Sequence, residues 1–425
     1  MRSVSLAWSA RRLAVSCRLL ICKRRCVDRT VSLFRALGRY SFGNVPTERT
    51  RVRSRPKTSI LFQIVSCAAG GMHSLLLSEH GKILSFGCND DGSLGRLTEE
   101  EEECFKAAVV HIEGETVSKI AAGNIHSVAL TTDCHVFIWG SYRDNSGAFG
   151  ISPKNPEFIS EPMKLSLPDS ITDIACGADH TLMLSQEGVI YTMGIAEQGR
   201  LGRIRKSHCC RENRRARQTM LTPLPMRVRR YRKPVLFDGI WAGRFSGFAR
   251  SVSDGRIWGW GLNNYHQLGE INPDDHEDNF VYQPVELAAF DPKKRWTQIC
   301  GGEQHTLALD SEGTVYSMGR PLYGRLGLGP ADANDPDVTK LTPVPGLEEC
   351  VVSIAAGDNC SFAIHKSGQL LSWGQGTNML GQGDREIAKD IDLYVPTQCA
   401  SKHLKDKTTI EIAAGSHHAI CIASG

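Results

Sequence analysis

The stretch DIACGADHTLMLSQEGVIYTMGIAEQGRLGR, residues 173–203, is the clearest copy of a unit that recurs along this chain. A short apolar run ends at Gly177, and His180 follows three residues later. Two apolar, partly alternating segments come next, with a turn at Gly188 between them. Short segments of this kind, bounded by glycine turns, are typical of β-strands. The unit therefore predicts several short strands and no long helix.

The Gly-x-x-His element at the centre of this unit recurs seven times from Ile64 onward. Five copies carry the histidine, at Gly70/His73, Gly123/His126, Gly177/His180, Gly302/His305 and Gly415/His418. Ser246 and Cys360 take its place in the other two copies, and the seven positions are 53, 54, 66, 59, 55 and 58 residues apart. A glycine ends the second strand in six copies, and a Leu-Gly closing element follows in several of them.

Units of this length, each with several short strands, predict an all-β, seven-bladed β-propeller over residues 61–425. One unit cannot bury its own apolar face, so neighbouring units must cover it. We interpret the repeated histidines (His73, His126, His180, His305 and His418) as structural. A side chain needed once per blade is better explained by a satisfied buried hydrogen bond than by repeated active sites.

Closure of the ring requires strands from outside the last repeat. The last copy reaches Gly425 soon after its first two expected strands, so we expect the N-terminal region to supply the missing strands. The candidate is the segment from Val31 to Val45. The rest of residues 1–60 is predicted to be a basic, disordered arm, and the alternatives are a merely solubilising tail or a wrongly assigned start of the coding sequence.

Charge is divided unevenly along the chain. Residues 1–60 carry 15 Lys and Arg against two acids, whereas the remainder has an acidic balance. A basic arm on an acidic body predicts contact with nucleic acid, an acidic surface or an import receptor. The Arg- and Ser-rich start is also compatible with a mitochondrial transit peptide.

Cysteine usage and hydropathy exclude several classes of protein. The 15 cysteines are odd in number and show no paired zinc spacing, which favours a reducing compartment and predicts no metal site. No apolar run approaches the roughly 20 residues of a membrane span, so no membrane partner is expected. We find no phosphate-binding glycine loop and no nucleophile motif, which disfavours an enzyme with covalent chemistry.

The repeats resemble the regulator of chromosome condensation family of propellers over about residues 62–425. Four motifs extend the resemblance to the chromatin-bound exchange factors of the family: SFGCNDDG at 85–92, WGSYRDN at 139–145, NYHQLG at 264–269 and YGRLGLG at 323–329. The resemblance implies a guanine nucleotide exchange factor for the small GTPase Ran. Such a protein uses no cofactor, stabilises the nucleotide-free GTPase and acts in the nucleus.

The same resemblance implies a set of GTPase-binding residues. Asp144 in the WGSYRDN motif, Asp179 directly before His180, and Arg203 after the closing element are the matched positions. A rigid wedge is expected as an exposed hairpin at 162–169, including Pro162 and Met163. Gln304 stands where the family motif has a histidine, so it can form hydrogen bonds but cannot be cationic. The alternatives are that Asp144 only caps a turn and that Asp179 only orients backbone.

A basic segment at 203–233 lies within the longest spacing between repeats, from His180 to Ser246, and carries 12 Lys and Arg against one acid. It resembles the switchback loop of the family, which places arginines on the acidic patch of the nucleosome. Arg214 and Arg217 are the matched pair, and arginine suits this role because its planar group binds carboxylates in a bidentate manner. The arm would add contacts to the DNA backbone. A loop that is only solvated is the alternative.

A second functional class remains open at this point. The chain could be a propeller scaffold of the same family without exchange activity, and its start would then fit a mitochondrial location. Asp144, Asp179, Arg203 and the two loop arginines distinguish the hypotheses, because a scaffold needs none of them.

Overall fold

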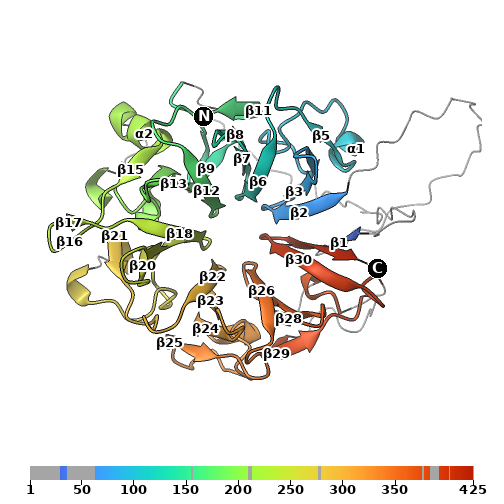
Figure 1. The fold of residues 1–425 in the computed structure, drawn as a ribbon, viewed down its shortest axis with the longest axis vertical. Coiled ribbons are helices and arrows are strands. Elements are labelled where there is room, and N and C mark those ends of the chain that lie inside the picture. The colour runs from blue at the N-terminus through green and yellow to red at the C-terminus, as the bar shows by residue number, and fades with distance from the viewer. Residues whose placement is uncertain are drawn as a thin grey trace, which may run out of the picture.

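A ring of small β-sheets surrounds a central axis in the computed structural model (Figure 1). The structure describes residues 29–35, 63–154, 157–208, 213–275, 279–375, 378–382, 392–401 and 403–424. Six of the sheets have four antiparallel strands each, and we call them blades 1 to 6 in chain order. The predicted all-β propeller architecture is therefore present.

The strands of the first three blades run in order from the channel to the rim. Blade 1 contains β2 (Ile64–Ala69), β3 (His73–Ser78), β4 (Ile83–Gly87) and β5 (Ala108–Val110). Blade 2 contains β6 (Val117–Ala122), β7 (His126–Thr131), β8 (Val136–Gly140) and β11 (Ile159–Lys164). Blade 3 contains β12 (Ile171–Cys176), β13 (His180–Ser185), β14 (Ile190–Gly194) and β15 (Leu224–Met226).

The next three blades repeat this order. Blade 4 contains β18 (Phe237–Ala242), β19 (Ser246–Ser251), β20 (Ile257–Leu262) and β21 (Phe280–Glu286). Blade 5 contains β22 (Trp296–Gly301), β23 (His305–Asp310), β24 (Val315–Gly319) and β25 (Val338–Pro343). Blade 6 contains β26 (Val351–Ala356), β27 (Cys360–His365), β28 (Leu370–Gly374) and β29 (Leu393–Gln398).

The expectation of seven blades needs correction, because the structure has six four-stranded blades. The last repeat supplies β30 (Thr408–Ala414) and β31 (His418–Ser424), and β1 (Arg29–Arg35) pairs antiparallel with β31 to give three strands. We call this three-stranded unit the closing sheet; it holds no fourth strand within the described residues. β1 overlaps the expected donor segment only at 31–35, and the rest of the predicted arm lies outside the described residues.

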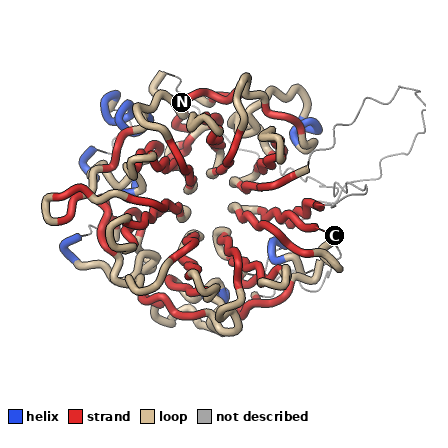
Figure 2. Tube along the Cα trace, viewed as in Figure 1, coloured by secondary structure: helices blue, strands red, loops and turns tan. Residues whose placement is uncertain are grey.

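Short helices, drawn in blue in Figure 2, and two extra hairpins are inserted between the strands of the blades. The α-helices are α1 (Glu101–Cys104) and α2 (Arg214–Leu221), and the hairpins pair β9 (Tyr142–Asp144) with β10 (Gly147–Gly150) and β16 (Arg229–Arg230) with β17 (Lys233–Pro234). The 3-10 helices are η1 (Glu197–Gly199), η2 (Lys206–His208), η3 (Pro273–Asp275), η4 (Leu322–Gly324) and η5 (Asn378–Leu380). Within the described ranges, no helix is long and apolar enough to cross a membrane.

The hydrophobic core lies between neighbouring blades. All six residues of β13 are buried, whereas β12 on the channel side has exposed and half-buried positions. Trp139, Trp260 and Trp373, each in the third strand of its blade, are fully buried. Each indole donates a hydrogen bond to a backbone carbonyl in the closing element of the preceding blade, at 2.9 to 3.1 Å. Each buried indole ring therefore packs between two blades while its N–H group keeps a hydrogen-bond partner.

The repeated histidines form a second set of contacts between blades. His73 Nε2 lies 2.9 Å from Ser127 Oγ in the next blade, and His305 Nε2 lies 2.9 Å from Ser361 Oγ. Ser361 Oγ donates to the carbonyl of Arg325, so we assign the Nε2–H tautomer to His305. Burial lowers the pKa of His305 to about 3, which keeps the ring neutral at neutral pH. This geometry agrees with a structural role for the repeat histidine.

Candidate functional site

One face of the ring carries the turns that precede the seven repeat positions, and we call it the His face. The loops after the third strands open on the same face, because the end of each third strand pairs with the start of the second strand, as Gly194 does with His180. The residue directly before each repeat position differs from turn to turn: Met72, Ile125, Asp179, Phe245, Gln304, Asn359 and His417. A uniform framework therefore presents different side chains around the channel.

Asp179 is the acidic member of this series, and it is only 5% exposed. One carboxylate oxygen accepts a hydrogen bond from the backbone N–H of Arg143 at 2.9 Å. The other lies 3.6 Å from Nη1 of Arg200, whose side chain is also buried. Burial raises the pKa of Asp179, although Arg200 and the Arg143 N–H act in the opposite direction. Asp179 thus holds two neighbouring segments in place, as the alternative interpretation of this residue expected.

The hairpin β9–β10 is fixed to blade 3 by Asp179 and by a second contact. Tyr142 is fully buried, and its hydroxyl lies 2.8 Å from Thr181 Oγ1. Asp144 is half-buried, and its Oδ1 accepts a hydrogen bond from the N–H of Ser146 at 2.8 Å. The structure therefore brings Asp144 and Asp179 to the same part of the His face. Asp144 also caps its own turn, which was the alternative considered for it.

Arg200 connects Asp179 to the next blade. Its guanidinium carbon lies 4.5 Å from the centre of the Phe245 ring, and its Nη2 donates to Gln198 Oε1 at 2.8 Å. The ring and the carboxylate together hold a charged group that is almost completely removed from water. A buried guanidinium of this kind needs such partners because desolvating a charge is costly.

Gln304 has a comparable partner in blade 5. Its Oε1 accepts hydrogen bonds from Arg325 Nη1 at 2.7 Å and Arg320 Nη1 at 3.2 Å. Burial lowers the pKa of Arg325 to about 10, so this side chain stays cationic at neutral pH. Arg320 also lies over the ring of Tyr265, 4.7 Å from its centre. A neutral amide oxygen thus organises two cations in the turn before His305.

Comparison with known proteins decides the family. Residues 35–421 match the RCC1-like domain. The chain belongs to the RCC1-like domain family. It is 37% identical to the regulator of chromosome condensation of Xenopus laevis over 375 residues, which is 87% of this chain and 84% of the relative. The corresponding human protein is 36% identical over 381 residues, 88% of this chain and 86% of the relative.

A solved structure from the same RCC1-like family agrees with this assignment. The crystal structure of Prp20p from Saccharomyces cerevisiae, described with its binding to Gsp1p and histones, aligns with a TM-score of 0.74 at 30% identity. The alignment covers 85% of this chain and 82% of Prp20p. Both the sequence and the fold of this chain are therefore similar to family members along most of their length.

Arg203 has a different environment from the other positions matched to the RCC1-like family. Its Nε donates to Thr192 Oγ1 at 2.9 Å, and its Nη2 donates to the carbonyls of Thr192, Thr219 and Thr222. Arg96 makes the same set of contacts in blade 1, to Ser85 and to two loop carbonyls. The structure therefore places Arg203 as a residue that joins a blade to its loop, rather than beside Asp179.

The expected wedge hairpin at 162–169 is wrong. Pro162 and Met163 lie in β11, the outer strand of blade 2, and Met163 pairs with Ile138 of β8. The register between β11 and β8 shifts between Ile159 and Met163, so Pro162 sits in an irregular part of the strand that tolerates a missing N–H. The exposed hairpin of this region is β9–β10.

The two loop arginines differ in their surroundings. Both belong to α2, which Asn213 caps by accepting hydrogen bonds from the N–H groups of Arg215 and Ala216. Arg214 is exposed. Arg217 is half-buried, lies 4.9 Å from the centre of the Phe149 ring, and donates to the Phe149 carbonyl. Arg217 thus attaches α2 to β10.

Sequence reasoning missed Arg200, Arg325 and Arg244, which lie on the His face; Arg244 lines the cavity in the central channel. Arg200 and Arg325 precede Leu-Gly in their closing elements, where other copies have Ser93, Gln267 or Met379. The signal available in the sequence was an arginine before Leu-Gly, a position at which the other copies carry an uncharged residue. Arg244 directly follows Gly243 in a copy that lacks the histidine, and nothing local marks its long-range contacts.

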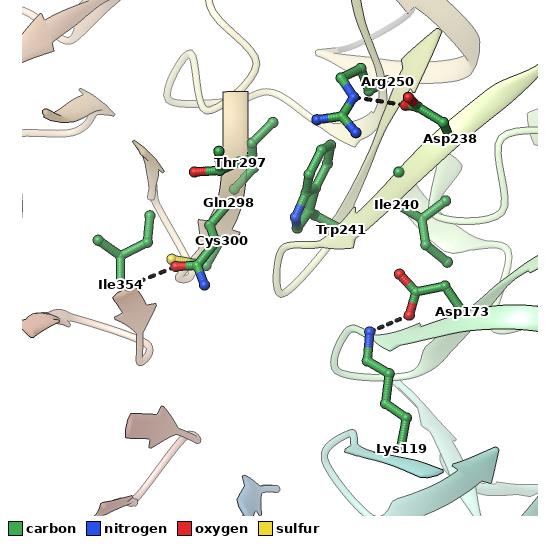
Figure 3. A pocket seen from close by; sticks show the side chains of 12 residues that line it. Lys119, Asp173, Asp238, Ile240, Trp241, Arg250, Thr297, Gln298, Cys300 and Ile354 are labelled. Atoms are coloured by element: carbon green, nitrogen blue, oxygen red, sulfur yellow. Dashed lines mark hydrogen bonds and ion pairs between the residues drawn. The ribbon is translucent and has the colours of Figure 1, made fainter. Parts of the chain in front are cut away.

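The opposite mouth of the channel holds a cavity of about 490 Å³ (Figure 3). Trp241 forms one wall, next to the ion pair of Arg250 Nε with Asp238 Oδ1 at 2.7 Å, and Lys119 pairs with Asp173 on another side. Every charged group that lines this cavity therefore already has a partner. Across the described ranges, no group of three or more metal-binding side chains occurs.

Proposed function

We propose that this chain is a guanine nucleotide exchange factor for the small GTPase Ran. The observation that carries this proposal is its similarity, over more than four fifths of its length, to regulators of chromosome condensation. A yeast relative that is 30% identical over 404 residues is named a guanine nucleotide exchange factor. The similarity extends through the blades that carry the His face, not only through one repeat.

The geometry suits an exchange factor because exchange needs a rigid surface and no covalent chemistry. The factor must bind the nucleotide-free GTPase more tightly than the loaded form, and reciprocity then weakens nucleotide binding. The β9–β10 hairpin offers such a surface, since the buried Asp179 and Tyr142 fix it to blade 3 and Arg200 pairs with Asp179. Asp144 and the exposed Arg143 are the side chains that we propose to contact the GTPase.

Release of a fluorescent guanine nucleotide from Ran tests this proposal. We expect the purified chain to accelerate release by several orders of magnitude in the presence of excess unlabelled nucleotide. Asp144→Asn should reduce the rate about tenfold, because its hydrogen bond to Ser146 survives while the charge is lost. A wild-type chain that does not accelerate nucleotide release would contradict the proposed exchange function.

We also propose that the chain binds chromatin through its basic segments, which would place it in the nucleus. The support is that Prp20p was described with its binding to histones, together with the exposed basic surface around α2. A second basic segment lies at the tip of the β16–β17 hairpin, where Tyr231 is 87% exposed between arginines. A complex of yeast RCC1 with Kap60 supports an import receptor as a further partner. No relative reported above supports the mitochondrial alternative.

Arg214→Glu is expected to weaken nucleosome binding about tenfold or more at moderate salt and to leave exchange on free Ran unchanged. The reason is that Arg214 is exposed on α2, so its reversal changes charge without removing a contact of the fold. Binding is measured by electrophoretic mobility shift, with Lys366→Glu on another loop as the matched control. Arg217→Glu should instead lower stability as well, because Arg217 packs on Phe149. Equal binding by Arg214→Glu and wild type would contradict this role.

The scaffold alternative makes the opposite prediction for the nucleotide assay. A scaffold would bind Ran weakly or not at all, and changes at Asp144 would have no effect on release. The release assay therefore separates the two hypotheses directly.

A further inference from the structure

Arg244 crosses the central channel on the His face. It belongs to the turn before β19 in blade 4, yet its Nη1 lies 2.6 Å from Asp358 Oδ1 in blade 6. The same nitrogen donates to Ser416 Oγ in the closing sheet, and Ser416 Oγ lies 3.3 Å from Asn124 Oδ1 in blade 2. One side chain therefore connects turns from separate parts of the ring across a cavity of about 270 Å³.

Arg244 also contacts the part of the face that holds Asp179. Its guanidinium carbon lies 5.4 Å from the centre of the Phe245 ring, the ring that Arg200 also contacts. Its backbone carbonyl accepts a hydrogen bond from the N–H of Ala178 at 2.8 Å, one residue before Asp179. A continuous chain of contacts thus runs from Asp358 through Arg244 to Asp179 and the β9–β10 hairpin.

We infer that the Arg244–Asp358 ion pair positions Asp179 and Arg200 for nucleotide exchange. Both members are largely buried, with side chains 17% and 19% exposed, so they act through their neighbours rather than by touching the GTPase. Arg244 is therefore a positioning residue. This inference rests on the proposed exchange function and adds a cross-channel ion pair to it.

The electrostatics of the pair support a functional role over a stabilising one. Burial raises the pKa of Asp358 to about 6 even though Arg244 lowers it, and Glu303 raises it further. Because the folded-state pKa is raised, stability falls as pH rises from about 4, the ordinary pKa of an aspartate, to about 6, and the loss is complete above that pH. Buried pairs often contribute little to stability, and strongly shifted groups concentrate at functional sites. The other titratable or charged groups that interact with the pair are Glu303, His417, Asp179, Arg200 and Cys360.

The test compares Arg244→Gln with Arg250→Gln. Arg250 is a matched control because it also lies in blade 4, pairs with an aspartate and packs near an aromatic ring, but on the opposite mouth of the channel (Figure 3). Arg244→Gln is expected to lower kcat/KM for exchange on Ran about tenfold, and Arg250→Gln less than twofold. Arg244→Lys should recover part of the loss.

Two further measurements identify the pair itself. Asp358→Asn should reduce exchange as much as Arg244→Gln does, and the double variant should be no worse than either single variant. The wild-type rate divided by the Asp358→Asn rate should fall towards one as pH decreases through about 6, where protonation of Asp358 breaks the wild-type pair. Any effect of pH on Ran itself changes both rates equally and drops out of this ratio. The measurement also uses only the wild type and Asp358→Asn, so it remains possible if Arg244→Gln does not fold.

The outcomes separate this inference from the proposed function. A wild-type chain without exchange activity would contradict both the proposed exchange function and this inference. If the wild type is active, any one of four results would overturn the positioning role and leave the exchange function intact. These are an Arg244→Gln variant as active as the wild type, an equal loss of activity in Arg250→Gln, additive effects of the two single changes at the pair, and a rate ratio that does not depend on pH.

Discussion

Asp179→Asn is expected to slow nucleotide release from Ran about 100-fold, which corresponds to about 2.7 kcal/mol of transition-state stabilisation. The carboxylate joins the Arg143 N–H to the buried guanidinium of Arg200. An amide can still accept the first hydrogen bond, but it leaves Arg200 without its counter-charge in a desolvated site. Removing one partner of a buried pair usually costs about 3–5 kcal/mol, so the local geometry should change.

The control for this variant is Asp173→Asn in the same blade. Asp173 pairs with Lys119 at the opposite mouth of the channel and is more exposed, so its loss should leave exchange unchanged. The double variant Asp179→Asn with Arg200→Met removes both buried charges and should recover much of the thermal stability. Exchange should remain slow in this variant. If exchange recovered together with stability, Asp179 would have only a structural role.

Gly123→Ala is expected to lower the free energy of unfolding by about 3 kcal/mol or to prevent folding. A Cβ atom at this position would lie 2.0 Å from Cε1 of His126 and 2.7 Å from the carbonyl of Gly177 in the next blade. The histidine cannot move away, because its Nε2 lies 3.1 Å from Thr181 Oγ1. Urea denaturation followed by tryptophan fluorescence measures the change.

Gly114→Ala separates this steric effect from backbone preference. Gly114 has a φ of 70°, but a Cβ there meets no atom within 4 Å, so the variant should cost about 1 kcal/mol. Gly123→Ala combined with His126→Ala should be less destabilised than the sum of the two single changes, since removing the ring opens the space. A Gly123→Ala variant as stable as the Gly114→Ala variant would contradict this explanation of the Gly-x-x-His motif.

The repeat could be predicted from the sequence because its signals are local. Gly177 and His180 lie three residues apart, and the strands that follow alternate or are bounded by glycine turns. The contacts that explain them were not local. His305 reaches Ser361 in the next blade. His180 is an exception, because the next blade has Gly247 at the position that Ser127 and Ser361 occupy in other blades, so no side-chain hydroxyl faces its ring.

The site was predicted unevenly. Asp144 and Asp179 were assigned because each lies within a motif; the structure brings them to one part of the His face, and their contact with a GTPase stays a prediction. Arg203 was assigned from its place after the closing element, yet its donors are used by Thr192, Thr219 and Thr222. The wedge at 162–169 was expected from two prolines, but the segment pairs with β8 as strand β11. A loop and an outer strand with weak alternation look alike in sequence.

The sequence alone determined the repeat, the all-β class and the family, because these depend on spacing within about 60 residues. The sequence suggested that the N-terminal region closes the ring, but only the tertiary structure decided which residues pair. β1 and β31 are separated by almost the whole chain, and they pair through backbone hydrogen bonds that do not depend on particular side chains. The same holds for Arg244 and Asp358, which are distant in sequence and meet across the channel. The stretch at 173–203 therefore identifies the blade, and contacts from other blades determine what Asp179 within it can do.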